Sequence, residues 1–192
     1  MPTPNDDALT FLLTRRSRPA KTLTGPVPDR TVLQVLLTAA ARTPDHGKLE
    51  PWRFIVLERQ ALLRLAGMIP ARGEALQIDA DKVAKAVDQY AKADLAVAVI
   101  CSPKPSAKIP QIEQVYSAGA VCLSLLNASL AAGWGANWLS GWASHDRTFI
   151  TDGLGLADHE TIAGFIHIGT ETSAPPERPR PDIDAITTWM TT

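Results

Sequence analysis

Between Glu113 and Asp146 the sequence contains no Asp, Glu, Lys or Arg. A run this long and this poor in charge has to be buried, either in a protein core or in a membrane. It is also rich in Ala, Gly, Ser and Asn, and no Lys or Arg lies close enough to anchor a membrane span. We therefore expect a helix over about 111–132, ended by Gly133, that is buried on nearly all sides in protein and does not enter a membrane.

Hydrophobic periodicity predicts the other elements. Helices are expected over 5–14, where Asn5 can act as the N-cap, and over 29–42, 60–76, 79–92 and 146–153. Strands are expected at "WRFIVLE" (52–58), at the apolar run "DLAVAVICS" (94–102), which is typical of a central strand, and at "TIAGFIHIGT" (161–170). A short strand or turn is expected at 135–141. This mixed order predicts an α+β fold with helices around a sheet.

The 192 residues suit a single domain over 1–192, in which about 175–192 form an extended C-terminal arm because "APPERPRP" holds four prolines. Apolar residues make up 45% of the chain, which allows a substantial core, and the net charge of −1 gives no case for nucleic-acid binding. The N-terminus does not resemble a signal peptide, so we expect a cytoplasmic protein. Cys101 and Cys122 lie in apolar runs and are predicted to be buried thiols.

The stretch "TRRSRPAK" (14–21) holds four cations and no acid at the end of the first predicted helix. Arg15, Arg16 and Ser17 could bind a phosphate through guanidinium groups and a hydroxyl. Cations are also favoured near a helix C-terminus, where they interact with the helix dipole. On composition alone, the second explanation is the stronger one.

The connector "TPDHGKLEPWRF" (43–54) is chemically mixed. Its prolines stiffen the backbone, and Asp45 can close a local turn. His46 is either a loop residue or a hydrogen-bond donor to a ligand, because neither the other histidines nor the cysteines are spaced with it as metal ligands. The sequence contains no G-x-S-x-G, G-x-G-x-x-G or P-loop motif, so we predict neither a metal site nor a catalytic side chain from motifs.

Three tryptophans and three glycines occur within "GWGANWLSGW" (133–142). Glycine lets a backbone approach a flat ligand closely, and tryptophan can cover such a ligand. Plain core packing of Trp134, Trp138 and Trp142 is an equally good explanation.

Taken in order, "RRS", "TPDHGKLEPWRF", the uncharged helix, "WLSG" and "GFIHIGT" resemble the nitroreductase family of flavoproteins, particularly its small bacterial members. The resemblance covers nearly the whole chain. It implies a central, mostly antiparallel sheet flanked by helices, and an intertwined homodimer with FMN at the subunit interface. Thr43 stands where alanine is common in the family, and Leu139 where a basic residue can occur.

The resemblance also implies which residues bind the cofactor. Arg15, Arg16 and Ser17 would hold the FMN phosphate and ribityl chain, while Trp138, Leu139 and Ser140 would line the ring. Arg42 and His46 would reach the same FMN from the other subunit. The flavin itself performs the hydride transfer, so no catalytic acid or base is named.

Three functions are compatible with these features. The leading hypothesis is an FMN-dependent oxidoreductase that uses NADH or NADPH to reduce a small electron-poor acceptor such as a nitroaromatic or a quinone. The second is a flavin-binding carrier, sensor or accessory protein without reductase turnover. The third is an interaction protein that has kept the fold and lost the cofactor.

Overall fold

Strand β3 (Leu95–Cys101) forms the centre of the sheet in the computed structural model, which describes residues 3–192. All seven of its residues are buried, as its unbroken apolar run predicts. It pairs with β2 (Trp52–Glu58) on one side and with β5 (Thr161–Glu171) on the other. The opposite edge of β5 pairs with β4 (Gly135–Leu139) and with β1 (Leu23–Thr24). Every one of these pairs is antiparallel, so the predicted antiparallel sheet is confirmed.

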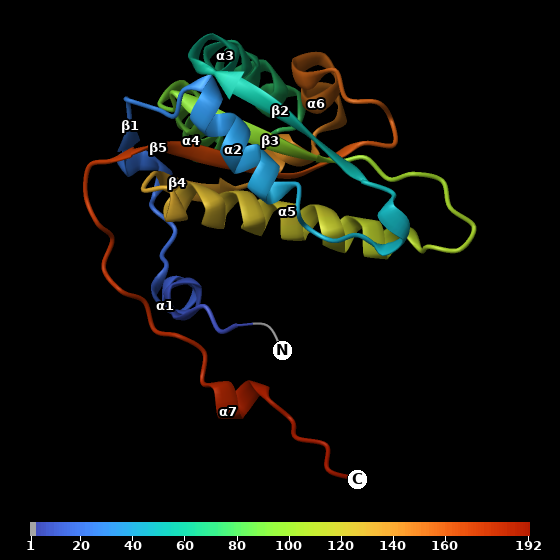
Figure 1. The fold of residues 1–192 in the computed structure, drawn as a ribbon. Helices are drawn as coiled ribbons and strands as arrows, with labels where there is room; N and C mark the ends of the chain where they lie inside the picture. The colour runs from blue at the N-terminus through green and yellow to red at the C-terminus, as the bar shows by residue number, and fades with distance from the viewer. Residues whose placement is uncertain (1–2) are drawn as a thin grey trace.

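Helices cover both faces of this sheet (Figure 1). Because side chains alternate along a strand, Ala96, Ala98 and Ile100 of β3 face one helix layer while Leu95, Val97 and Val99 face the other. The first layer contains α3 (Arg59–Ala75), α4 (Ala80–Ala91) and α6 (Arg147–Leu154), and the second contains α2 (Arg30–Ala40) and α5 (Gln111–Ala131). Short 3₁₀ turns lie at Ala20–Thr22 (η1), His46–Lys48 (η2) and Trp142–His145 (η3).

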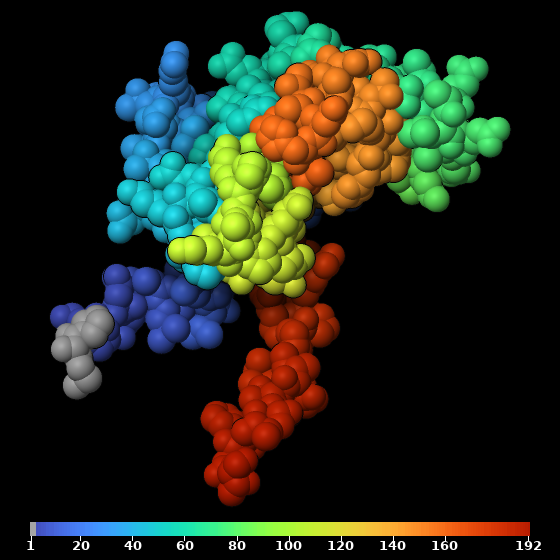
Figure 2. Space-filling view, turned by 90° about the vertical axis from the view of Figure 1, so that its right-hand side faces the viewer, coloured from blue at the N-terminus to red at the C-terminus, as the bar shows by residue number. Residues whose placement is uncertain are grey.

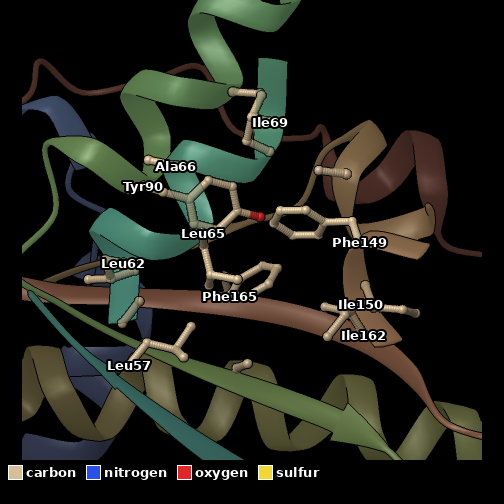
Figure 3. Packing of buried hydrophobic residues seen from close by; sticks show 14 of the residues in the cluster. Leu57, Leu62, Leu65, Ala66, Ile69, Tyr90, Phe149, Ile150, Ile162 and Phe165 are labelled. Atoms are coloured by element: carbon tan, nitrogen blue, oxygen red, sulfur yellow. The ribbon is translucent and has the colours of Figure 1, made fainter. Parts of the chain in front are cut away.

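An aromatic cluster joins the first helix layer to the sheet (Figure 3). The Tyr90 ring of α4 packs edge-on against Phe165 of β5, with centroids 5.5 Å apart, and lies 5.6 Å from the ring of Phe149 in α6. All three side chains are buried. This packing fixes α4 and α6 above β5 and so determines what surrounds the later half of that strand.

Within one chain, helix α5 is buried on one side, whereas the sequence predicts burial on nearly all sides in its final environment. Val121, Cys122 and Leu125 are buried against the sheet, whereas Ile112 and Tyr116 are exposed. Among the described residues, α5 is the one helix long and apolar enough to cross a membrane, and 44% of its apolar window is buried. A soluble core helix passes the same test, so its sequence does not distinguish the two environments. In this chain the exposed side of α5 is left as an apolar stripe.

Both ends of the chain project from the body of the protein (Figures 1 and 2). Helix α1 (Asp6–Thr14) begins at the predicted cap, where the Asn5 carboxamide accepts the Ala8 N–H, but it buries none of its residues. The tail beyond Thr172 is irregular except for α7 (Ile183–Ile186). Large apolar side chains are therefore exposed at both ends: Leu9, Leu12, Leu13, Ile183, Ile186, Trp189 and Met190.

Two ion pairs fasten the loops around α6. Glu160 accepts two hydrogen bonds from Arg53, each 2.7 Å long, and Asp146 accepts two from Arg72 of 2.6 and 3.0 Å. The Arg53 guanidinium, helped by the Ala157 N–H, lowers the pKa of the buried Glu160 carboxyl to about 2 against the desolvation that would raise it. The first pair ties β2 to the start of β5, and the second ties α3 to the start of α6.

The Arg53–Glu160 pair predicts acid sensitivity. The Glu160 pKa is lower in the folded chain than its ordinary 4.5, so its stabilisation is present above about pH 4.5 and is lost as the pH falls towards 2. Glu160→Gln should lose up to about 3 kcal/mol of unfolding free energy at pH 7. Its stability should also vary less than that of the wild type between pH 5 and pH 2. Urea unfolding across this range measures both effects.

Glu74→Gln serves as the control, because Glu74 is exposed and forms no ion pair within residues 3–192. Equal pH dependence of Glu160→Gln and the wild type would show that this pair does not govern acid unfolding.

Candidate flavin-binding site

An arginine cluster forms where the chain leaves α1. The Arg15 guanidinium donates to the Ser17 hydroxyl at 3.0 Å, and Arg16 donates to the Pro176 carbonyl of the tail at 3.0 Å. Glu177 lies 4.0 Å from Arg16 Nε and forms a 2.7 Å ion pair with Arg180. The tail therefore adds a third guanidinium, Arg180, to the two that the sequence motif predicts.

Positive charge in this cluster exceeds what the nearby acid can neutralise. Burial, followed by the nearby Arg180 and Arg16 cations, lowers the pKa of Arg15. The Nε groups of Arg15 and Arg16 are buried and have no hydrogen-bond partner within residues 3–192. Buried donors normally have partners, and guanidinium groups match phosphate oxygens in geometry and charge. A phosphate group therefore fits this cluster, which favours the binding explanation over a simple helix-end effect.

Two hydrogen bonds to the Arg18 backbone bring the arginine segment against strand β4. The Arg18 N–H donates to the Ala136 carbonyl at 2.8 Å, and the Asn137 carboxamide donates to the Arg18 carbonyl at 2.6 Å. Because Asn137 directly precedes Trp138, the structure places the predicted 15–17 and 138–140 segments next to each other, although they are far apart in sequence.

Trp138 differs from its two tryptophan neighbours. Trp134 and Trp142 pack against the two cores, as the packing explanation predicts, but Trp138 is 38% exposed. Its indole N–H lies 3.3 Å from the Ala163 carbonyl, and a Cβ built on Gly164 would lie only 2.0 Å from Nε1. The indole thus lies directly over a glycine and presents a flat ring at the surface, beside the partly buried Leu139 and the exposed Ser140.

The connector that begins at Thr43 is fastened along α5. The Thr43 hydroxyl lies 2.9 Å from that of Ser124, and the Pro44 carbonyl accepts a 3.0 Å bond from Ser117. The Asp45 carboxylate accepts the Leu49 N–H and closes the predicted local turn. These contacts hold the loop that carries His46 in a defined position.

His46 and Arg42 lie away from the other predicted ligands. His46 Nδ1 is 2.6 Å from Glu113 Oε2 in the first turn of α5, and its side chain is largely exposed. Arg42 is exposed just beyond α2. The arginine segment instead meets β4, which begins just after the other end of α5, about 27 Å along the helix from Glu113. Within one chain, Arg42 and His46 therefore lie too far from segments 15–17 and 138–140 to contact the same ligand.

Metal ligands and thiols add nothing to this site in the described part of the chain. No group of three or more His, Cys, Asp or Glu among residues 3–192 is placed to hold a metal ion. Cys101 and Cys122 are free and buried, as predicted, and burial raises the pKa of Cys122 to about 12.

The sequence model described as "Nitroreductase family" matches residues 12–170. The chain belongs to the nitroreductase family. It is 35% identical over 166 residues to a Haemophilus influenzae protein named "Putative NAD(P)H nitroreductase", covering 85% of this chain and 88% of the relative.

Two solved structures share the nitroreductase fold of this chain. The nitroreductase-like family protein from Bacillus cereus has a TM-score of 0.77 at 23% identity and covers all of both chains. The FMN and NADPH-dependent nitroreductase NfnB from Sphigopyxis sp. strain HMH has a TM-score of 0.72 at 21% identity, covering 96% of this chain and 99% of that one. At these identities the likeness establishes the fold alone.

The contact between Trp138 and Gly164 predicts a strong coupling between the two positions. Gly164→Ala should lower the free energy of unfolding by about 1–3 kcal/mol, because the added methyl group overlaps the indole. The same substitution in a Trp138→Ala background should cost far less, since the overlapping ring is absent. A double-mutant cycle by urea unfolding measures this coupling.

Gly67→Ala is the matched control, because a Cβ there meets nothing within 4 Å and alanine favours the surrounding helix. Equal costs of Gly164→Ala in both backgrounds would contradict the described position of Trp138.

Proposed function

We propose that the protein is an FMN-dependent oxidoreductase that passes a hydride from NADH or NADPH through the flavin to an electron-poor acceptor such as a nitroaromatic or a quinone. The observation that carries the proposal is the arginine cluster with unpartnered buried donors, held beside the exposed ring of Trp138. Membership of the nitroreductase family supports it, as do the named cofactors of the structural neighbour NfnB.

Each group in the site has a distinct role in this proposal. Arg15, Arg16 and Arg180 would neutralise and orient the FMN phosphate, and Ser17 would contact the ribityl chain. Segment 138–140 would line the isoalloxazine ring with the indole and backbone groups. Bound FMN would supply the redox chemistry of hydride transfer between the nicotinamide and the acceptor. The protein's part is to bind and orient the reactants, so no side chain is proposed as a general acid or base.

We further propose that the site is completed by a second copy of the chain. The exposed side of α5 carries Ile112, Val115, Tyr116 and Leu123 at helical spacing, which is suited to packing against another helix. If a twofold axis packs α5 antiparallel to its copy, the His46 end of one helix meets the arginine end of the other. The projecting apolar residues of α1 and the C-terminal arm would then cover the partner and intertwine the dimer.

The phosphate role predicts a difference between two flavins. Replacing Arg15 and Arg16 together with Ala should lower FMN affinity at least about tenfold, because each charge-assisted bond contributes about 1.5–3 kcal/mol. Riboflavin affinity should change little, since riboflavin lacks the phosphate. Arg180→Ala should give the same pattern with a smaller loss. Flavin fluorescence titration of the apoprotein measures both affinities.

Lys82→Ala on the exposed side of α4 is the charge control and should leave both affinities unchanged. An equal loss of FMN and riboflavin affinity in the arginine variants would remove the phosphate from this explanation.

The shared site predicts complementation between two defective chains. An Arg15→Ala, Arg16→Ala chain and an Arg42→Ala, His46→Ala chain should each form a homodimer that binds FMN poorly. In their heterodimer one site collects all four changes and the other collects none. Purified heterodimer, formed with differently tagged chains, should therefore bind about one FMN per dimer with wild-type affinity.

A site built within one chain gives the opposite result, because each heterodimer site would then carry one defect. An intact heterodimer that recovers no FMN binding would place His46 outside the partner's site.

A further inference from the structure

The proline-rich start of the C-terminal arm, "APPERPRP" (174–181), lies against the arginine cluster that follows α1. The Arg16 guanidinium donates to the Pro176 carbonyl at 3.0 Å, across 160 positions of sequence. Closely spaced prolines favour a polyproline II backbone with three residues per turn, in which residues three apart lie on the same side. Glu177 and Arg180 have this spacing, and their side chains form an ion pair beside the cluster.

Glu177 thereby places a negative charge among the arginines. Its carboxylate is 2.7 Å from the Arg180 guanidinium and 4.0 Å from Arg16 Nε. The Arg178 N–H donates to the same carboxylate at 2.8 Å and, together with the Arg180 and Arg16 cations, lowers the pKa of Glu177. The carboxylate is therefore ionised at neutral pH and partly neutralises the cluster.

This carboxylate is an incomplete partner for the arginines. The 4.0 Å distance to Arg16 is too long for a hydrogen bond. Within residues 3–192 the buried Nε groups of Arg15 and Arg16 have no hydrogen-bond partner at all. The Glu177 side chain is 64% exposed and that of Arg16 only 16%, so the acid lies at the outer edge of the cluster. Ion pairs this exposed contribute little, so a stronger anion can displace the carboxylate at small cost.

A phosphate monoester competes with Glu177 for these donors. Near neutral pH it carries between one and two negative charges and offers three terminal oxygens, whereas a carboxylate carries one charge and two oxygens. It can therefore reach the donors that Glu177 leaves unpaired while also attracting Arg180. The nearby carboxylate repels such an anion, so phosphate binding and the present contacts of Glu177 oppose each other.

We propose that Glu177 is a built-in competitor of the cofactor phosphate, whose carboxylate holds Arg16 and Arg180 in the free protein and leaves them when the phosphate binds. This inference rests on the proposed function and adds to its site a residue that sets the affinity for the cofactor. In the free protein Glu177 reduces the repulsion among three close guanidinium groups. The same charge weakens the binding of a second anion.

Glu177→Gln tests both effects, because they have opposite signs. FMN affinity should rise about two- to fivefold, the range expected for an exposed charge interaction, and riboflavin affinity should stay unchanged. The urea midpoint of the apoprotein should fall at low salt. A residue that only positions Arg180 would behave differently, since its loss would lower FMN affinity as well as stability. Glu74→Gln, at an exposed position on α3, is the control and should change neither affinity.

Inorganic phosphate probes the cluster without a flavin. At an ionic strength held constant with sodium chloride, phosphate should raise the urea midpoint of the wild-type apoprotein, and should raise it further in Glu177→Gln. An unchanged or lower FMN affinity in Glu177→Gln, or an equal phosphate shift in the two proteins, would overturn the inference. If the wild type bound neither flavin, the proposed function would fail, and the phosphate shifts would still decide the role of Glu177.

Discussion

Backbone pairing along β5 holds together those parts of the proposed flavin site that lie in one chain. This strand pairs with β3, β4 and β1, and its pairing with β4 places Trp138 over Gly164 and Asn137 opposite His167. The N-terminal arginine segment is then attached to β4 through Arg18. Because a ladder of backbone hydrogen bonds fixes these positions, a shift of β4 by one residue would turn Trp138 away from Gly164 to the other face of the sheet.

Electrostatics determines which ligand group the arginine cluster can bind. The arginine cluster gathers three guanidinium groups around one carboxylate, which suits a fixed dianion such as a phosphate.

Local sequence patterns predict most of the elements, because burial and capping leave clear signals in this chain. The apolar run of β3, the Asn5 cap and the glycine that ends α5 all occur where they are expected. Within one chain α5 is buried on one side only, because an uncharged helix face can be reserved for a partner as well as for the chain's own core. Composition alone cannot distinguish these two environments.

The candidate site is predictable only where its residues form short motifs. Arg15, Arg16 and Trp138 lie in such motifs, but sequence alone could not separate Trp138 from the core tryptophans, because the difference depends on Gly164 of another strand. Arg180 is brought to the cluster by a contact between residues 160 positions apart.

Anaerobic stopped-flow absorbance of the purified protein loaded with FMN tests the central claim most directly. On mixing with NADH or NADPH, the visible flavin band should bleach within the time of a catalytic turnover, and it should return when a quinone or a nitroaromatic is added. A protein that stays colourless with FMN, or a bound flavin that neither nucleotide reduces, would contradict the assignment as an oxidoreductase. The second result would instead favour a flavin carrier or sensor.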